Sequence, residues 1–403
     1  MKKQGHQVTK LPMYLPLFFD EHDLNEIPVF YGAISIYLKQ MYPIFRHTPA
    51  WVDRLLNSGP MLKLAARMAG STNAKGLEEM TISMLMGEEG KQKDELNRMV
   101  SWMSEYLQPD VIHLSNALLL GLAPKLKKEF PNAILFCSLQ DEDVWVDAMK
   151  DSFRDKTWAL MSTKAQYVDA FIAVSDFYAG TSIEKMNIPN EKVLTNHLGV
   201  DPDEYKYVAT DKKERNIGYI SRMCEANGFD IIVDAFILLK KDPTFEDVKL
   251  ILAGGSTGDD KALIKRVRQK LKNENLMEQV DFHEDFDGEG RHEFFSKVKI
   301  ISVPVRNGEA FGLYLLESMA SGVPVVQPNL GAFPEIVNKS NGGVIYENNS
   351  PEGLAFALQN LLKQEDKLHE LSNSARKGVE KEFNIYDQAD KLIGIYTRFL
   401  KKN

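Results

Sequence analysis

Short apolar runs alternate with helical stretches along most of the chain. DVIHLS, AILFCSL, AFIAVS and KVLTNHLGVD follow one another from residue 110, and NIGYIS, VKLILAGG, QVDFHE, VKIISVPV and VPVVQP repeat the pattern from residue 216. Short runs that are apolar throughout and alternate with helices are typical of strands buried in a parallel sheet. Because the polar segment 210–215 separates the two series, the pattern predicts an α/β protein with two parallel-sheet domains.

The first 109 residues follow a different pattern. HQVTKLPMYL, residues 6–15, is strand-like, and residues 49–105 are mostly helical in periodicity and rich in methionine. Such a helical region either packs into the core, or forms an adaptable ligand-binding surface or a face that contacts a membrane. Core packing is the favoured interpretation, and the other remains an alternative.

Composition narrows the class of protein. The 403 residues carry a net charge of -8, which argues against nucleic acid as the main partner. The two cysteines, Cys137 and Cys224, fit a reducing compartment. No apolar run reaches the roughly 18 to 20 residues that span a bilayer, and MKKQGHQV has no apolar signal-peptide core. We therefore expect a cytoplasmic protein.

The segment NGEAFGLYLLESMASGVPVV, residues 307–326, carries the clearest chemical signal. Glu309 lies in the loop between a strand and a helix, and Glu317 lies in that helix. Ligands of open α/β sheets bind outside the carboxyl ends of strands, and a helix start with small residues suits phosphate. Carboxylates accept hydrogen bonds from hydroxyls, so the segment suggests a nucleotide-sugar site. Two solvated acids are the alternative.

This segment resembles the signature of retaining GT-B glycosyltransferases of family four, which is E-x7-E, then E-A-M-A-x-G-x-P-V and G-x-x-E-I-V. GYISRM, LILAGG, VDFHEDF and GGVIYENNSPEGLAFAL resemble other motifs of that family. The resemblance covers residues 110–400 well and 1–109 poorly. It implies Rossmann-like domains over 1–208 and 209–384, facing each other across a cleft, and a C-terminal helix over 385–403 that packs back toward the first domain.

The resemblance also implies roles for single residues. Glu309 would face the donor sugar, Glu317 would accept hydrogen bonds from the ribose, and Arg222 would stabilise the leaving diphosphate. The other donor-binding residues that it implies are Ser221, Asn227, Phe311, Gly312, Leu313 and Glu284, the last in the loop 283–286 near the base.

In the first half, three candidate residues lie at or just after the ends of predicted strands. His113 stands where the family often has a cleft-facing histidine, so we count it as catalytic, with a structural histidine as the alternative. Gln140 stands where the family commonly has a histidine, and we expect Gln140 and Asp141 to contact the acceptor or the donor sugar.

The sequence departs from the family at Asn227, where a lysine is usual. An amide hydrogen-bonds a phosphate but brings no charge. The change leaves Arg222 as the main cation that the sequence identifies, and it predicts weaker donor turnover unless another lysine reaches the site.

The acidic cluster 141–143 and the D-x-D triplets at 201 and 285 are weak metal signals. Because GT-B enzymes generally do not depend on a D-x-D metal, the resemblance implies no metal and no cofactor. MKKQGHQVTKLP resembles the end of the first helix and the second strand of the family's N-terminal domain. We therefore expect about 30 further residues to precede it.

These observations predict an enzyme that transfers a sugar, with retention, from a nucleotide-sugar donor to a saccharide or lipid-linked acceptor in glycan or surface polysaccharide synthesis. A GT-B sugar-nucleotide epimerase, a phosphorylase and a non-catalytic sugar-nucleotide-binding relative are the alternatives. Lys125, Lys127 and Lys128 form a small basic cluster, consistent with weak peripheral contact at the inner membrane face and equally with a solvated helix end.

Overall fold

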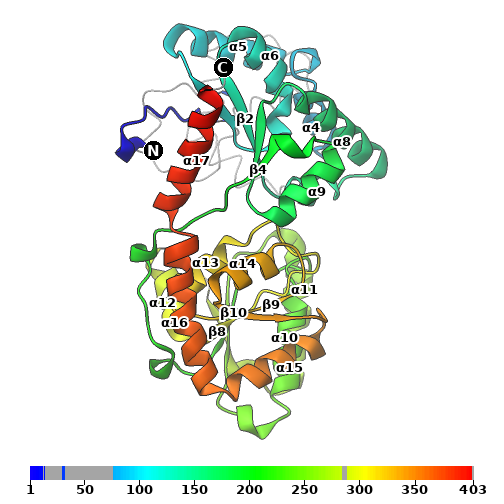
Figure 1. The fold of residues 1–403 in the computed structure, drawn as a ribbon. Helices are drawn as coiled ribbons and strands as arrows, with labels where there is room; N and C mark the ends of the chain where they lie inside the picture. Colours follow the sequence, from blue (N-terminus) through cyan, green and yellow to red (C-terminus); the bar gives the residue numbers. More distant parts are fainter. Residues whose placement is uncertain (12, 14–29, 32–75, 284–287, 402–403) are drawn as a thin grey trace. The chain divides into compact units, whose positions relative to one another are not determined.

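The computed structural model describes residues 1–11, 13, 30–31, 76–283 and 288–401. The chain divides into two compact units (Figure 1). The first comprises residues 1–173, 179–195 and 392–403, and the second comprises 174–178 and 196–391. The second unit therefore begins before the boundary expected at residue 208. None of the helices in the described ranges has the length and apolar character that a membrane crossing requires.

The first unit is built on a four-stranded sheet whose strands are all parallel, in the order β1-β2-β3-β4. The strands are β1 (Val111–Leu114), β2 (Ile134–Leu139), β3 (Ala170–Ala173) and β4 (Val193–Thr195). Each coincides with an apolar run that the sequence pattern identified. Among the described residues of this half of the chain, the helices are α4 (Glu78–Leu85), α5 (Lys93–Tyr106), α6 (Ala123–Glu129), α7 (Glu142–Val146), α8 (Asp151–Ala165) and α9 (Asp176–Met186).

The C-terminal helix α17 (Ile385–Leu400) supplies part of this unit's core. Its Leu392, Ile395, Tyr396 and Phe399 pack against the buried sheet residues Ile134, Phe136, Ala170 and Ile172. These four helix positions are three or four residues apart, so they form one apolar face.

The N-terminal expectations are met only in part. Residues 6–11 form no strand, and Met13 makes a single isolated bridge with Phe30. The predicted strand over 6–15 is therefore wrong for its described residues. Within the predicted helical region, α4 and α5 form between residues 76 and 106, and residues 49–75 lie outside the described ranges.

The second unit has a six-stranded parallel sheet in the order β10-β9-β8-β5-β6-β7. Its strands are β5 (Ile217–Ile220), β6 (Leu250–Ala253), β7 (Val280–His283), β8 (Ile300–Ile301), β9 (Val325–Pro328) and β10 (Gly343–Tyr346). Residues of β5, β6, β8 and β9 are buried along their whole length, which fits the continuous apolar runs in the sequence. The predicted all-parallel α/β architecture is confirmed in both units.

The strand order reverses between β5 and β8. The chain moves outward through β5, β6 and β7 in one direction and through β8, β9 and β10 in the other. Right-handed connections therefore place their helices on opposite faces. The helices are α10 (Phe229–Leu239), α11 (Lys261–Asn273), α12 (Glu289–Lys297), α13 (Leu313–Ala320), α14 (Phe333–Ser340), α15 (Pro351–Leu362) and α16 (Glu365–Glu382). Ligands of such sheets bind at the reversal point, outside the carboxyl ends of the strands.

Candidate functional site

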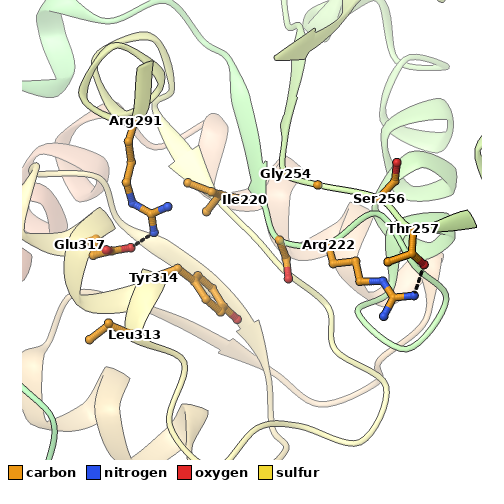
Figure 2. A pocket seen from close by; sticks show the side chains of 11 residues that line it. Ile220, Arg222, Gly254, Ser256, Thr257, Arg291, Leu313, Tyr314 and Glu317 are labelled. Carbon is orange, nitrogen blue, oxygen red and sulfur yellow. Dashed lines mark hydrogen bonds and ion pairs between the residues drawn. The ribbon is translucent and has the colours of Figure 1, made fainter. Parts of the chain in front are cut away.

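A pocket of about 490 Å³ opens at this reversal point in the second unit (Figure 2). Its walls come from the ends of β5 and β6, from α12 and from the first turns of α13. The lining residues are Ile220, Ser221, Arg222, Gly254, Gly255, Ser256, Thr257, Arg291, Leu313, Tyr314 and Glu317. Four of the residues predicted from the sequence, Ser221, Arg222, Leu313 and Glu317, thus lie in one pocket, although they are distant in the chain.

The start of α13 offers unused backbone donors. Gly312 precedes the helix with a φ of 84°, a conformation that glycine adopts without strain. Within the described part of the chain, the N–H groups of Phe311, Gly312 and Leu313 donate no hydrogen bond, and no side chain caps the helix. A helix start in this state is suited to an anion.

The loop before α13 is held in place from behind. The Ser175 hydroxyl donates to the Ala310 carbonyl at 2.6 Å, and the Ala332 N–H donates to the Glu309 carbonyl at 3.0 Å. The Phe311 ring lies 6.2 Å from the ring of His197. These contacts fix the backbone without using the three amides.

Glu309 lies beside the helix start, as its sequence position predicts. A side-chain carbon on Gly312 would come within 3.0 Å of a Glu309 carboxylate oxygen, so the carboxylate folds toward that turn. Burial raises the pKa of Tyr314 and of Tyr219, and the charge of Glu309 adds to both increases. Glu309 does not line the pocket itself, so the structure brings it near the site without testing its sugar-facing role.

Glu317 is buried in the pocket wall, with 7% of its surface exposed. Its Oε2 accepts a hydrogen bond and ion pair from Arg291 Nη2 (Figure 2). Its Oε1 accepts a hydrogen bond from the Tyr205 hydroxyl at 3.1 Å. Burial and the Glu317 charge both raise the pKa of Tyr205, which keeps this hydroxyl a donor. Neither Arg291 nor Tyr205 was identified from the sequence.

Arg222 occupies the opposite side of the pocket (Figure 2). Its Nε donates to Asp260 at 2.8 Å and its Nη2 donates to Thr257 at 2.6 Å. Burial favours a higher pKa for Asp260, but hydrogen bonds from Arg222 and Thr257 outweigh it and the pKa is lowered. The side chain of Arg222 remains 44% exposed, so its guanidinium is both oriented and accessible.

Asn227 does not line the pocket, and its side chain supports the β5 loop. Its Nδ2 donates to the Ser221 hydroxyl at 2.8 Å. A side-chain carbon on Gly254 would lie 1.9 Å from the Ser221 carbonyl, so glycine is required for the ends of β5 and β6 to meet. Asn227 therefore positions Ser221, and its direct contact with the donor stays a prediction.

His113 lies in the first unit between the sheet and α17. Its Nδ1 contacts the Tyr396 hydroxyl, and its Nε2 lies 2.8 Å from the Ser138 hydroxyl. Burial lowers the pKa of His113 to about 4, which keeps the ring neutral near pH 7. Both ring nitrogens thus have partners inside the unit, an arrangement that favours the structural alternative.

Gln140 and Asp141 follow β2, as predicted. The Gln140 side chain donates to the Ser115 carbonyl at 2.9 Å. Asp141 has a φ of 56°, and the next residue, Glu142, accepts from the amides of Gln140 and Ala117 at 2.8 Å each. Glu142 is 3% exposed and orders the loop. The acceptor contact of Gln140 and Asp141 stays a prediction.

The other sequence signals are placed as follows. Glu284 and the triplet at 285 lie outside the described residues, and His283 ends β7. In the triplet at 201, Asp201 accepts hydrogen bonds from the Asp203 amide and the Tyr386 hydroxyl. In the basic cluster, Lys125 pairs with Glu88 and Glu129 and Lys127 pairs with Asp169, so two of its charges are matched by acids.

One trio in the described ranges has metal-ligand geometry. The donor atoms of Asp176, His197 and Glu335 lie within 4.8 Å of one another. The Glu335 carboxylate already accepts from His197 at 2.5 Å and from the amides of Asp176 and Phe177. Burial favours a higher pKa for Glu335, but these hydrogen bonds outweigh it and lower the pKa. The trio therefore orders the backbone next to the loop before α13.

Comparison with known proteins places this geometry in context. Residues 202–378 match the family model for glycosyl transferases group 1. The lipopolysaccharide core biosynthesis mannosyltransferase LpsB of Rhizobium meliloti (strain 1021) is 25% identical over 250 residues, which cover 58% of this chain and 67% of that protein. The N-acetyl-alpha-D-glucosaminyl L-malate synthase of Bacillus anthracis is 24% identical over 312 residues, which cover 74% and 77%.

A solved structure shares the fold. The crystal structure of Anabaena HepE in complex with UDP superposes with a TM-score of 0.66 at 17% identity, covering 77% of this chain and 84% of that one. The family match covers all the residues that line the pocket. Taken together, the matched family, the glycosyltransferase relatives and the two all-parallel sheets support a GT-B glycosyltransferase.

Proposed function

We propose that the protein is a retaining hexosyltransferase that uses a nucleotide-sugar donor. One observation carries the proposal. At the reversal point, the start of α13 carries three amides that have no hydrogen-bond partner among the described residues, and the adjoining pocket, lined by Leu313, holds an accessible arginine and a buried carboxylate. The first two groups suit a diphosphate, and the third suits ribose hydroxyls. The UDP complex of a protein with the same fold supports this class of donor.

The donor would be held through each of its parts. The amides of Phe311, Gly312 and Leu313 bind the diphosphate, and Glu317 accepts hydrogen bonds from the ribose. Arg222, fixed by Asp260 and Thr257, stabilises the charge that develops on the diphosphate as it leaves. Glu309 accepts hydrogen bonds from the sugar hydroxyls and orients the ring.

The transfer is a substitution at the anomeric carbon. The bond from that carbon to the diphosphate oxygen breaks, and a bond to the acceptor hydroxyl oxygen forms on the same face. The acceptor proton passes to the leaving phosphate oxygen. Retention by this front-face route requires no protein nucleophile, and the oriented Arg222 and the amides at the start of α13 support it.

The acceptor is proposed to be a saccharide or lipid-linked glycan in polysaccharide synthesis, on the cytoplasmic side. The LpsB relative, a lipopolysaccharide core mannosyltransferase, supports this class. Gln140 and Asp141 are the proposed acceptor-side groups. No metal is assigned a role, and the trio at Asp176 is occupied with the protein backbone.

A panel assay tests the proposal. Purified protein is incubated with UDP-, GDP- and ADP-sugars in the presence of EDTA, and release of the nucleoside diphosphate is followed by chromatography. We expect one donor to be turned over, slowly with water and faster with a saccharide acceptor, and a Glu309→Gln variant to be slower. NMR of the product should show the donor's anomeric configuration. Absence of turnover with every donor, or an inverted product, would contradict the proposal.

A further inference from the structure

Arg291 is a second cation of the pocket, on the side opposite Arg222 (Figure 2). It extends from α12 to Glu317 on α13, and the Glu317 carboxylate is the one hydrogen-bond partner of its guanidinium among the described residues. The guanidinium also lies 5.9 Å from the Phe295 ring. Its side chain is 26% exposed, so the pair borders the space that a ligand would fill.

The elements that carry this pair are fixed by two other cations. Lys213 Nζ donates to the Phe295 carbonyl on α12 at 3.1 Å and to the Ser321 carbonyl after α13 at 3.5 Å. Arg376 Nη1 donates to the carbonyls of Tyr205 and Ala320 at 2.9 Å each. Neither cation lines the pocket. Both join the backbones that present Tyr205, Arg291 and Glu317, so the three side chains form a built unit.

The physical reason for such a unit is the burial of Glu317. A carboxylate that is 7% exposed is costly unless a cation and hydrogen bonds compensate for the lost water. Arg291 and Tyr205 each engage a different oxygen. Because an ionised carboxylate offers about four lone-pair sites, each oxygen keeps capacity for a ligand hydroxyl. The planar guanidinium also restricts the carboxylate to one orientation.

We propose that Arg291 is a donor-positioning residue that holds the Glu317 carboxylate in the orientation that accepts the ribose hydroxyls. The inference rests on the proposed function and deepens it, since it identifies how this chain prepares the ribose subsite. Loss of Arg291 leaves a buried carboxylate without its cation, which favours a side chain displaced from this orientation. Recognition of the ribose should then fail, while contacts with the diphosphate at α13 persist.

The test compares ribose recognition in matched variants. Calorimetry measures the dissociation constants of UDP, GDP and ADP, and then of the 2′,3′-dideoxy form of the best ligand. We expect wild type to bind the dideoxy form roughly tenfold or more weakly, the range for hydrogen bonds to a charged group. Arg291→Met should weaken binding of the ribonucleotide by about the same factor. The dissociation constants of the ribonucleotide and its dideoxy form should then be nearly equal. Arg291→Lys should restore part of the ratio.

Lys297→Met is the matched control. It removes one positive charge from the same helix, where Lys297 pairs with the exposed Glu293 outside the pocket. We expect its ribose-to-dideoxy ratio to equal that of wild type. If Arg291→Met does not fold, Arg291→Lys replaces it in the test. We expect Arg291→Lys to lower the ratio of the two dissociation constants as well, by a smaller factor.

Two results overturn the inference in distinguishable ways. If wild type discriminates between the two ligands and the Arg291 variants keep that ratio, the proposed function stands and the role of Arg291 is wrong. If wild type binds none of the three nucleoside diphosphates, both the proposed function and this inference are wrong.

Discussion

The carboxyl ends of the strands differ between the two sheets. In the six-stranded sheet they lead to groups that keep hydrogen-bonding capacity within the described structure, among them the amides of 311–313 and the accessible Arg222. In the four-stranded sheet, His113, Gln140 and Glu142 are paired with groups of their own unit. The carboxyl ends of the strands thus carry groups available to a ligand in the six-stranded sheet. In the four-stranded sheet, the corresponding groups form hydrogen bonds with one another and with the backbone.

The difference shows why position alone does not identify a functional residue. A polar residue at a strand end either faces a ligand or satisfies the backbone around it, and both uses require the same residue types. The two uses differ in whether the groups keep hydrogen-bonding capacity that the protein itself does not use. The sequence indicated the candidate site in the second unit because a glycine before a helix start is visible in the sequence, and there the amides have no partner among the described residues.

The largest expected effect concerns Arg222. Arg222→Ala should lower kcat/KM by roughly 10² to 10³, because it removes an oriented cation from the leaving diphosphate. Steady-state kinetics with the donor found in the panel assay measures the loss. Arg266→Ala, which removes an exposed charge of α11, should change kcat/KM less than twofold or so. Equal effects of the two substitutions would contradict the assignment.

Glu309 should act mainly on turnover. Glu309→Gln keeps the shape beside Gly312 and removes the charge that orients the sugar, so we expect kcat to fall roughly 10- to 100-fold. Affinity for the bare nucleoside diphosphate, which lacks the sugar, should stay within about twofold. A variant that loses nucleotide affinity while kcat is preserved would show that Glu309 serves the nucleotide instead.

Lys213 gives a pH-dependent prediction. Burial lowers its pKa from 10.5 to about 7. Below both values the folded protein bears the full cost of the buried charge. Between them the unfolded chain binds more protons, so this group makes the free energy of unfolding rise with pH. Relative to Lys213→Met, wild type should gain up to about 1.4 kcal/mol per pH unit between about pH 7 and pH 10.

Urea denaturation of both proteins at several pH values measures this slope. The exposed Lys265 supplies the control, since the difference between wild type and Lys265→Met should not change with pH. The free energy of unfolding of wild type relative to Lys213→Met should therefore rise with pH. If it stays constant or falls as pH rises, burial does not lower the pKa of Lys213.

The smallest expected effect is that of His113. Because Ser138 and Tyr396 engage both ring nitrogens, His113→Gln should leave kcat within about threefold and lower the melting temperature through the weakened α17 contact. Thermal denaturation and kinetics on one preparation separate the two roles. A hundredfold fall in kcat with unchanged stability would instead support a catalytic role for His113.

The sequence predicted the strands well, because they depend on local patterns, and the α13 site that it also indicated stays a prediction. Apolar runs identify buried strands, and Gly312 with the following helix predicts an anion site. Arg291 could not be predicted, since GEGRHEFF reads as a solvated helix and its partner Glu317 is 26 residues away. Lys213 and Tyr205 were missed for the same reason: their partners are set by tertiary packing. The strand expected at residues 6–15 is not formed along residues 6–11, because a strand-like local pattern is not enough without a neighbouring strand to pair with.

The central claim is that the pocket of the second unit binds a nucleoside diphosphate through Glu317. Calorimetric titration of wild type and Glu317→Ala with UDP, GDP and ADP tests it most directly. The account predicts that wild type binds at least one of them and that Glu317→Ala binds the same ligand tenfold or more weakly, the range for hydrogen bonds to a charged group. Undiminished binding by Glu317→Ala, or no binding of any of the three by wild type, would contradict it.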